Sequence, residues 1–132
     1  MQPTELTTLA KQAMARAYAP YSGFHVGAAL LCADGTVYTG SNVENGSYGA
    51  TNCAERTAFF TAVHHGHREF TAIAICGGMG GNISDFCPPC GICRQVMSEF
   101  CGPDFQIHLL GPEDALRSYT LSQLLPGSFV LK

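Results

Sequence analysis

Three cysteines in two short segments have the types and spacing of a metal site. Cys53 lies two residues before Glu55. Cys90 and Cys93 stand three residues apart, further along the chain. Thiolates are good zinc ligands, and three protein ligands with an open position are typical of a catalytic zinc, whereas structural zinc has four. A carboxylate beside such a site is placed to move protons to or from a zinc-bound water. The pattern therefore favours a catalytic zinc with Glu55 beside it.

Each of these residues also has a simpler structural interpretation. Asn52 with Glu55 three residues later fits a helix N-cap with a capping box, which would make Glu55 structural. Cys87 together with the other three thiols would make a closed four-thiolate structural site. A third alternative is that all of them are buried free thiols. We favour the three-ligand site because Cys87 precedes two prolines in a loop and does not lie on the helix face.

Two predicted helices position these thiols. One runs from residue 51 or 52 to about 65, and another covers 90–100, so all three thiols fall in first helical turns. Free N–H groups and the helix dipole there favour the thiolate form. Arg56 and Arg94 directly follow the two cysteine segments. We expect one of these arginines to donate hydrogen bonds to a thiolate and offset the negative charge of the site.

The remaining elements predict a mixed sheet with helices on both faces. Helical spacing of apolar residues covers 4–18, and a last helical piece lies around 119–125. Strands are expected at 24–33, 36–43, 70–76 and 105–110, the first two joined by an Asp-Gly turn. The Gly- and Asn-rich segment 42–50 is expected to be a loop in which backbone approaches a ligand closely. This order of elements is typical of an α/β fold in a single domain, 1–132.

A histidine tract follows the helix that ends near residue 65. His64, His65 and His67 resemble a metal-binding tract. We interpret them as helix C-terminal residues that interact favourably with the dipole, followed by a solvated loop. A metal role is the lesser alternative.

Composition excludes several classes of partner. The chain has 132 residues, about one domain. Charged residues make up 13% and apolar residues 46%, against roughly 25% charged in an average domain, which favours an oligomer. With a net charge of −3 and no run of Lys or Arg, nucleic acid and anionic membrane are not expected as partners. The sequence has no apolar stretch long enough to span a membrane and no signal pattern, so we expect a cytosolic protein. Because the number of cysteines, seven, is odd, we expect no disulfide framework.

Five segments in the same order resemble one known family, the small homotetrameric zinc-dependent cytidine deaminases. They are 19–28 (APYSGFHVGA), 42–49 (NVENGSYG), 53–57 (CAERT), 89–95 (PCGICRQ) and 124–129 (LLPGSF). Zinc deaminases share a His-x-Glu and Pro-Cys-x-x-Cys signature with a three-cysteine variant, and Cys53 stands where many members have His. The resemblance implies a three-layer α/β/α cytidine deaminase-like fold with a mixed five-stranded central sheet.

The resemblance also implies a reaction, the hydrolysis of cytidine or 2′-deoxycytidine to uridine or 2′-deoxyuridine with release of ammonia in pyrimidine salvage. It assigns one Zn²⁺ per subunit to Cys53, Cys90 and Cys93. Glu55 would take a proton from the zinc-bound water and pass it to N3 of the ring. Hydroxide would attack C4, and Glu55 would then help to protonate the departing ammonia.

Substrate contacts are implied in the same way. The resemblance assigns them to Phe24, Asn42, Glu44, Tyr48, Ala54 and Phe129. Phe24 would form an aromatic wall beside the base, while Asn42 and Glu44 would hold the ribose hydroxyls with Tyr48 near the sugar. Phe129 would be laid over the pyrimidine by a neighbouring subunit, so the active site would depend on assembly into a homotetramer.

Two departures and two alternative functions remain. The sequence departs from the family's usual residues at two places. Cys87-Pro88 stands where an apolar residue followed by Ser is usual, and Gly46 stands where Ala is common. The alternatives are a deaminase of a cytosine nucleoside antibiotic such as blasticidin S, and a non-catalytic zinc-stabilised interaction domain. A base within a polynucleotide would call for a basic groove or stacking platform, which the sequence lacks. We therefore expect a free nucleoside in a mostly apolar pocket.

Overall fold

Apolar strands from both halves of the chain assemble into one sheet. A computed structural model describes residues 1–131, which form five strands in the order β2-β1-β3-β4-β5. β3 and β4 are parallel, and the other neighbouring pairs are antiparallel. The strands are β1 (Phe24–Cys32), β2 (Val37–Ser41), β3 (Phe70–Met79), β4 (Gln106–Leu110) and β5 (Leu116–Thr120). The mixed five-stranded sheet implied by the resemblance is confirmed.

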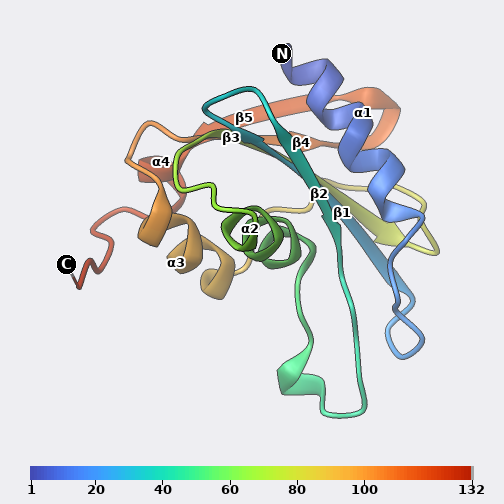
Figure 1. Cartoon of the computed structure of the whole chain (residues 1–132). Helices are drawn as coiled ribbons and strands as arrows, with labels where there is room; N and C mark the ends of the chain where they lie inside the picture. Colours follow the sequence, from blue (N-terminus) through green and yellow to red (C-terminus); the bar gives the residue numbers. More distant parts are fainter. Residues whose placement is uncertain (132) are drawn as a thin grey trace.

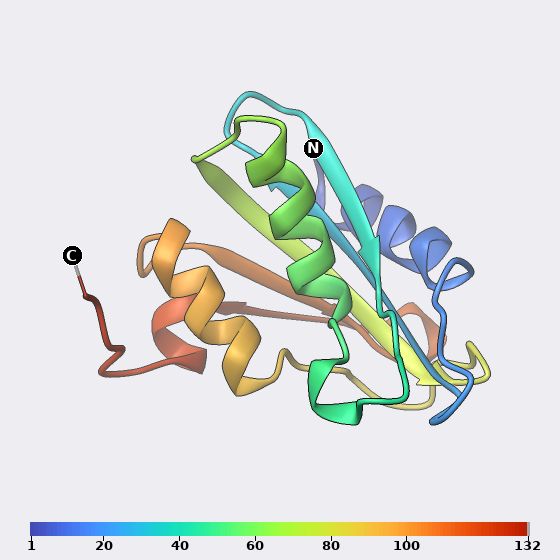
Figure 2. The ribbon, with the colours of Figure 1, turned by 60° about the horizontal axis from the view of Figure 1, so that its bottom comes forward.

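Helices cover both faces of this sheet and make three layers (Figure 1). They are α1 (Pro3–Met14), α2 (Ala54–His64), α3 (Gly91–Phe100) and α4 (Leu121–Leu124), with 3-10 turns η1 (Tyr48–Ala50) and η2 (Pro112–Asp114). α1 lies on one face, and α2 and α3 lie side by side on the other (Figure 2). Among residues 1–131, no helix has both the length and the apolar character needed to cross a bilayer.

The central strands are buried on both sides because alternate residues enter different cores. In β3, Ile73 and Ile75 pack beneath α2 and α3, whereas Ala72, Ala74 and Cys76 face α1. Small side chains on the α1 side let that helix approach the sheet closely. The larger ones fill the space below the other two helices, so the layer that carries the thiols rests on the larger core.

Helix α1 ends four residues earlier than its apolar spacing predicts. Its last residue is Met14, not Tyr18. Tyr18 instead pairs with the loop after β2, where its N–H donates to Asn42 O at 2.9 Å and its carbonyl accepts from Glu44 N at 2.9 Å. These long-range bonds take Tyr18 out of the helix and fix the loop that carries two predicted substrate contacts.

The predicted helical piece around 119–125 is only partly correct. Leu116–Thr120 is the edge strand β5, paired with β4, and only Leu121–Leu124 is helical. The helix begins at Thr120, whose hydroxyl accepts from Gln123 N in a capping box. β5 is short and largely exposed, so it has little hydrophobic alternation, and its pairing with β4 determines its structure.

Gly40 lets α2 lie directly on β2. A Cβ at Gly40 would stand 2.5 Å from Ala54 O and 2.6 Å from Ala58 N, both backbone atoms of the first turns of α2. Because backbone cannot move aside cheaply, only glycine permits this approach. The glycine therefore positions the helix end that carries Cys53 and Glu55.

We expect Gly40→Ala to lower the free energy of unfolding by about 1–3 kcal/mol, the usual cost of overpacking. Thermal unfolding of the zinc-loaded protein measures this effect. Gly102→Ala is the matched control, since a Cβ there would meet nothing within 4 Å and the residue has no positive φ. Equal melting temperatures for the two variants would contradict the argument.

Candidate active site

The three predicted thiols meet where two helices begin. Cys53 is the N-cap of α2, Cys90 is the N-cap of α3, and Cys93 lies in the first turn of α3. The three sulfur atoms lie within 4.8 Å of one another, and the Sγ atoms of Cys53 and Cys90 are 3.9 Å apart. Since α2 and α3 lie side by side on one face of the sheet, their N-termini bring together thiols that are distant in sequence (Figure 2).

This arrangement fits a zinc ion. Two sulfurs bound tetrahedrally at about 2.3 Å from one zinc lie about 3.8 Å apart, close to the distance between Cys53 and Cys90. Cys87 does not belong to the group of sulfur atoms that lie within 4.8 Å of one another. The closed four-thiolate alternative is therefore not supported, and Cys53, Cys90 and Cys93 are the residues that would hold the metal.

Hydrogen bonding within the cluster favours negative charge on sulfur. Arg56 Nη2 donates to Cys53 Sγ at 3.2 Å and to Thr51 O at 3.3 Å. The pKa of Cys53 is lowered to about 5 because Cys93 and then Arg56 hydrogen-bond to its sulfur. The same bond to Cys53, together with burial, raises the pKa of Cys93. Hydrogen bonding therefore favours negative charge on Cys53, beside the two sulfurs that would share a metal with it.

Only one of the two predicted arginines contacts a thiol. Arg94 donates from Nε to Pro89 O and from Nη1 to Leu124 O, both at 2.7 Å. It joins the start of α3 to the end of α4, because its guanidinium finds two backbone carbonyls within reach. The expected contact with a thiolate is thus made by Arg56.

We expect Arg56→Ala to weaken zinc binding by about 10–100-fold, the usual effect of removing a group that hydrogen-bonds to a metal ligand. Competition with a chromophoric chelator measures this affinity. Arg16→Ala serves as the control, because Arg16 is an exposed arginine that does not line the cavity beside the thiols. Zinc affinity equal to that of the parent would show that the guanidinium does not support the thiolates.

Glu55 is a buried carboxyl in the first turn of α2, with 4% of its surface exposed. The N-cap of this helix is Cys53, not Asn52, and no side chain caps it, so the capping-box alternative is wrong. Asn52 instead donates to Thr57 Oγ1 at 3.0 Å. Burial, and then the negative charge of Cys53, raise the pKa of Glu55 to about 7. A carboxyl of this kind can hold or release a proton near neutral pH.

A cavity of about 230 Å³ opens beside the thiols and Glu55. Its walls include four predicted substrate contacts, Phe24, Asn42, Glu44 and Ala54, together with Cys53 and Cys90. Five further lining residues were not predicted as contacts: Ser22, Val26, Thr51, Cys87 and Pro88. Alternation along the strand at 24–33 could have indicated Val26. Ser22 lies within the segment 19–28 that carries the resemblance, and Thr51 lies two residues before Cys53, but no pattern at either position indicated a cavity wall.

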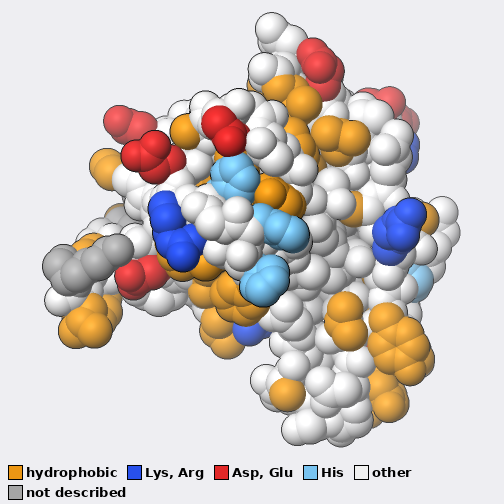
Figure 3. Space-filling view, in the orientation of Figure 1, with side chains coloured by type: hydrophobic (Ala, Val, Ile, Leu, Met, Phe, Trp, Pro, Cys, Tyr) orange, Lys and Arg blue, Asp and Glu red, His pale blue; other side chains and the backbone are white. Residues whose placement is uncertain are grey.

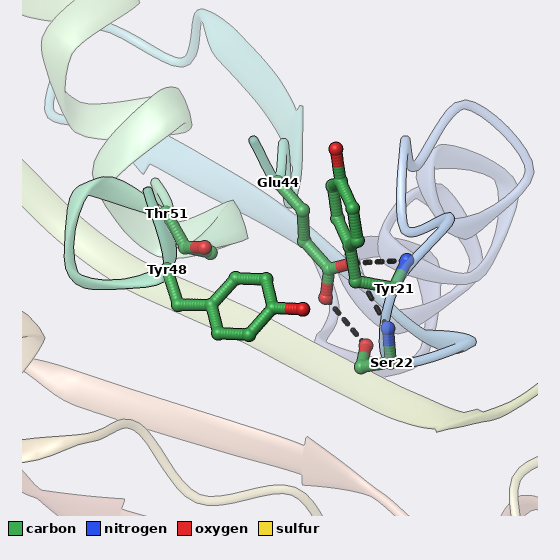
Figure 4. A pocket seen from close by; sticks show the side chains of 5 residues that line it. All are labelled: Tyr21, Ser22, Glu44, Tyr48 and Thr51. Carbon is green, nitrogen blue, oxygen red and sulfur yellow. Dashed lines mark hydrogen bonds between the residues drawn. The ribbon is translucent and has the colours of Figure 1, made fainter. Parts of the chain in front are cut away.

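Asn42 and Glu44 line the part of the cavity that the resemblance assigns to the sugar, here called the sugar end, and backbone hydrogen bonds hold both side chains there. Asn42 Oδ1 accepts from Val26 N at 2.9 Å, and its Nδ2 donates to Phe24 O at 2.8 Å. Glu44 accepts from the N–H groups of Tyr21 and Ser22 at 3.0 and 3.1 Å and from the Ser22 hydroxyl (Figure 4). The bonds from Ser22 hold the pKa of Glu44 below its usual range. This end of the cavity is therefore negatively charged.

Tyr48 lines an adjoining cavity of about 300 Å³ with Tyr21 (Figure 4). The two cavities share Ser22, Glu44 and Thr51, and the two tyrosine rings meet edge to face at 5.4 Å. Tyr48 thus lies next to the predicted sugar end.

Phe129 is the predicted contact that this chain does not bring to the site. Its side chain is 67% exposed, and it is not among the residues that line either cavity. Its carbonyl accepts from Gln95 Nε2 at 2.9 Å, which holds the C-terminal segment near α3.

Comparison with known proteins agrees with this site. The family model for the cytidine and deoxycytidylate deaminase zinc-binding region matches residues 1–109. A cytidine deaminase of Sporosarcina psychrophila is 47% identical over 129 residues, covering 98% of this chain and 92% of its own length. One of Halalkalibacterium halodurans is 50% identical over 118 residues, covering 89% and 86%. The crystal structure of cytidine deaminase from Burkholderia pseudomallei matches with a TM-score of 0.90 at 46% identity, covering 98% of this chain and 100% of that one. The chain therefore belongs to the cytidine and deoxycytidylate deaminase family.

Proposed function

We propose that this protein is a zinc-dependent hydrolase that deaminates cytidine and 2′-deoxycytidine to uridine and 2′-deoxyuridine. The observation that carries the proposal is one cavity whose walls include Glu55, two of the three convergent thiols, and the polar side chains of Asn42 and Glu44. Held by the three thiols, zinc supplies the Lewis acidity that makes water nucleophilic at neutral pH. The residues of the chain then bind and orient the nucleoside and move its protons.

Glu55 is the proposed proton carrier. Its burial keeps bulk water away, and a pKa near 7 lets it accept a proton from the attacking water and give it up again. We assign the first proton of that water to ring atom N3. The second comes from the same oxygen as it becomes the C4 carbonyl, and Glu55 passes it to the amino group, which leaves as ammonia when its bond to C4 breaks. Phe24 and Val26 supply apolar walls for the flat base, which keeps water from the reacting ring.

Asn42 and Glu44 are the proposed sugar-binding groups. Both side chains already make hydrogen bonds to the backbone. The Glu44 carboxylate has about four acceptor positions and the Asn42 amide has about four hydrogen-bonding positions, so each can still bind a ribose hydroxyl. Tyr48 lies near the same end in the adjoining cavity. None of the described residues that line the two cavities is Lys or Arg, and Glu44 is ionised. A neutral nucleoside is therefore favoured over a 5′-phosphate.

The ultraviolet absorbance change during incubation of cytidine with the purified zinc-loaded protein tests the proposed function. We expect turnover of cytidine and 2′-deoxycytidine, and much slower reaction of cytidine 5′-monophosphate and blasticidin S. No turnover of either nucleoside would overturn the proposed activity. Faster reaction of blasticidin S would instead support the antibiotic deaminase.

We further propose that this single deaminase domain assembles into a homotetramer in the cytosol. Exposed apolar side chains near the C-terminus and on the α2–α3 layer support assembly, namely Phe60, Ile92, Phe129, Val130 and Leu131. Only 13% of residues are charged, and all seven cysteines are free thiols, as a reducing compartment requires. Phe129 would reach a neighbouring site, so Phe129→Ala is expected to raise KM for cytidine without changing zinc content. Light scattering of the parent measures the assembly.

A further inference from the structure

A second cluster of possible metal ligands lies at the opposite end of α2. Cys32 ends β1, Asp34 lies in the turn between β1 and β2, and His67 follows α2. One ligand atom from each of the three lies within 4.8 Å of the other two. Because α2 has eleven residues, about 16 Å of helix separates this group from the catalytic thiols. We name Cys32, Asp34 and His67 the hairpin cluster.

The hairpin cluster is held in place by the surrounding backbone. Asp34 Oδ1 accepts from Thr36 N at 2.9 Å, which leaves Oδ2 directed to His67 Nδ1 at 3.7 Å. The His67 N–H donates to Ala62 O at 3.0 Å, and its ring meets Tyr38 edge to face at 5.2 Å. The Cys32 N–H donates to Thr36 O at 2.8 Å. Backbone and ring contacts thus hold all three residues in place without using the Cys32 sulfur or Asp34 Oδ2.

An ion can reach the cluster from solvent. The Asp34 side chain is 60% exposed and that of His67 is 21% exposed, while Cys32 is buried beneath them. Figure 3 shows histidine side chains gathered on this face of the molecule, in the region where α2 ends. The cluster therefore has a buried sulfur at its base and two polar ligands at an open rim.

The donor set selects a class of ion. One thiolate, one imidazole and one carboxylate suit zinc and related transition ions, whereas magnesium and calcium prefer oxygen ligands alone. His67 Nδ1 and Asp34 Oδ2, 3.7 Å apart, are within ion-pair distance but too far apart for a hydrogen bond. That pairing does not account for the Cys32 sulfur beside them. A cation between the three groups would join them all.

We propose that Cys32, Asp34 and His67 form a second site for a divalent transition ion such as zinc, separate from the catalytic thiols. The bound ion adds a link between the β1–β2 turn and the segment after α2, which are already joined by the hydrogen bond that Ala33 N donates to Glu69 O at 2.9 Å. Binding at this site stabilises the folded chain, because an ion that binds only the native state shifts the folding equilibrium.

Cobalt(II) titration of protein loaded with one equivalent of zinc per chain, so that the three-thiol site is filled and the hairpin cluster is free, tests the proposed site under reducing conditions. We expect one saturable equivalent per chain and an ultraviolet charge-transfer band from a single thiolate. A chromophoric chelator of zinc in the same sample should report no released zinc. Absence of the band, or a band that grows in step with zinc release, would overturn the proposal, since the cobalt would then lie at no site or at the catalytic one.

Variants at the three ligands complete the test. Cys32→Ser should abolish the charge-transfer band, and Asp34→Asn and His67→Gln should each weaken cobalt binding by at least about tenfold. Cys101→Ser and Asp85→Asn, which lie outside the cluster, are the controls and should bind as the parent does. If Cys32→Ser fails to fold, cobalt binding by Asp34→Asn and His67→Gln tests the site instead. Parent-like binding by both would overturn the proposal.

Discussion

Glu55→Gln is expected to lower kcat for cytidine by about 10²–10⁴-fold, the usual contribution of a general acid–base group. Glutamine has the same shape but cannot take a proton from water or return it. Because Glu55 is buried and its pKa is raised by burial, replacing it with a neutral amide should not reduce the free energy of unfolding. Steady-state turnover, zinc content and thermal unfolding are the measurements.

The control for this variant is Glu69→Gln, which makes the same change at an exposed carboxyl outside the cavity. It should leave turnover unchanged. If Glu55→Gln retained the turnover of the parent, Glu55 would have no role in proton transfer. A variant that lost zinc as well as activity would instead place Glu55 among the groups that hold the metal.

Cys93→Ser is expected to remove the zinc ion that the three thiols would hold and to remove turnover with it. Cys93 is buried in the first turn of α3, and its sulfur belongs to the cluster of three. Zinc present at about 1,000 times its Kd stabilises a protein by about 4 kcal/mol, and this stabilisation should be absent from the variant. Metal analysis and thermal unfolding with and without added zinc measure both effects.

Cys87→Ser provides a matched comparison. Cys87 lies in the loop before α3 and lines the cavity together with Cys53 and Cys90, but its sulfur is not part of the cluster. Burial raises the pKa of Cys87 to about 12, so it remains a neutral thiol. This variant should keep its zinc and its zinc-dependent stabilisation. Loss of zinc from Cys87→Ser together with its retention in Cys93→Ser would contradict the ligand assignment.

Local patterns predicted most of the secondary structure. Apolar spacing, the Asp-Gly turn and the prolines before residue 90 indicated α1, β1, β2, β3, α2 and α3, with errors of a few residues at their ends. Those errors have tertiary causes. Tyr18 leaves α1 because it bonds to the loop at Asn42 and Glu44, and residues 116–120 form a strand because β4 lies beside them. The partners of Tyr18 lie far along the chain. β4 is close in sequence to residues 116–120, but that exposed segment has little hydrophobic alternation to indicate a strand.

The candidate site was predicted through residue types and spacing. Cys53, Cys90 and Cys93 were recognisable because few other chemistries need three thiols in that pattern with a carboxylate two residues from the first. The choice between Arg56 and Arg94 was not predictable, since both follow a cysteine segment. In the folded chain Arg94 donates its hydrogen bonds to the carbonyls of Pro89 and Leu124, so only Arg56 contacts a thiol.

By itself, the sequence determined the donor set of the metal site, the carboxylate beside it and the alternation of helices and strands. Tertiary structure alone decided which atoms meet. Gly40 lets α2 lie against β2, α3 lies beside it, and their first turns then bring the sulfurs within 4.8 Å. The same folding brings Ser22 to Glu44 and His67 to Asp34, pairs with no signal in the sequence. The physical reason is that residue type sets which interactions a side chain can make, whereas its distance to a partner far along the chain is set by the packing of whole helices on the sheet.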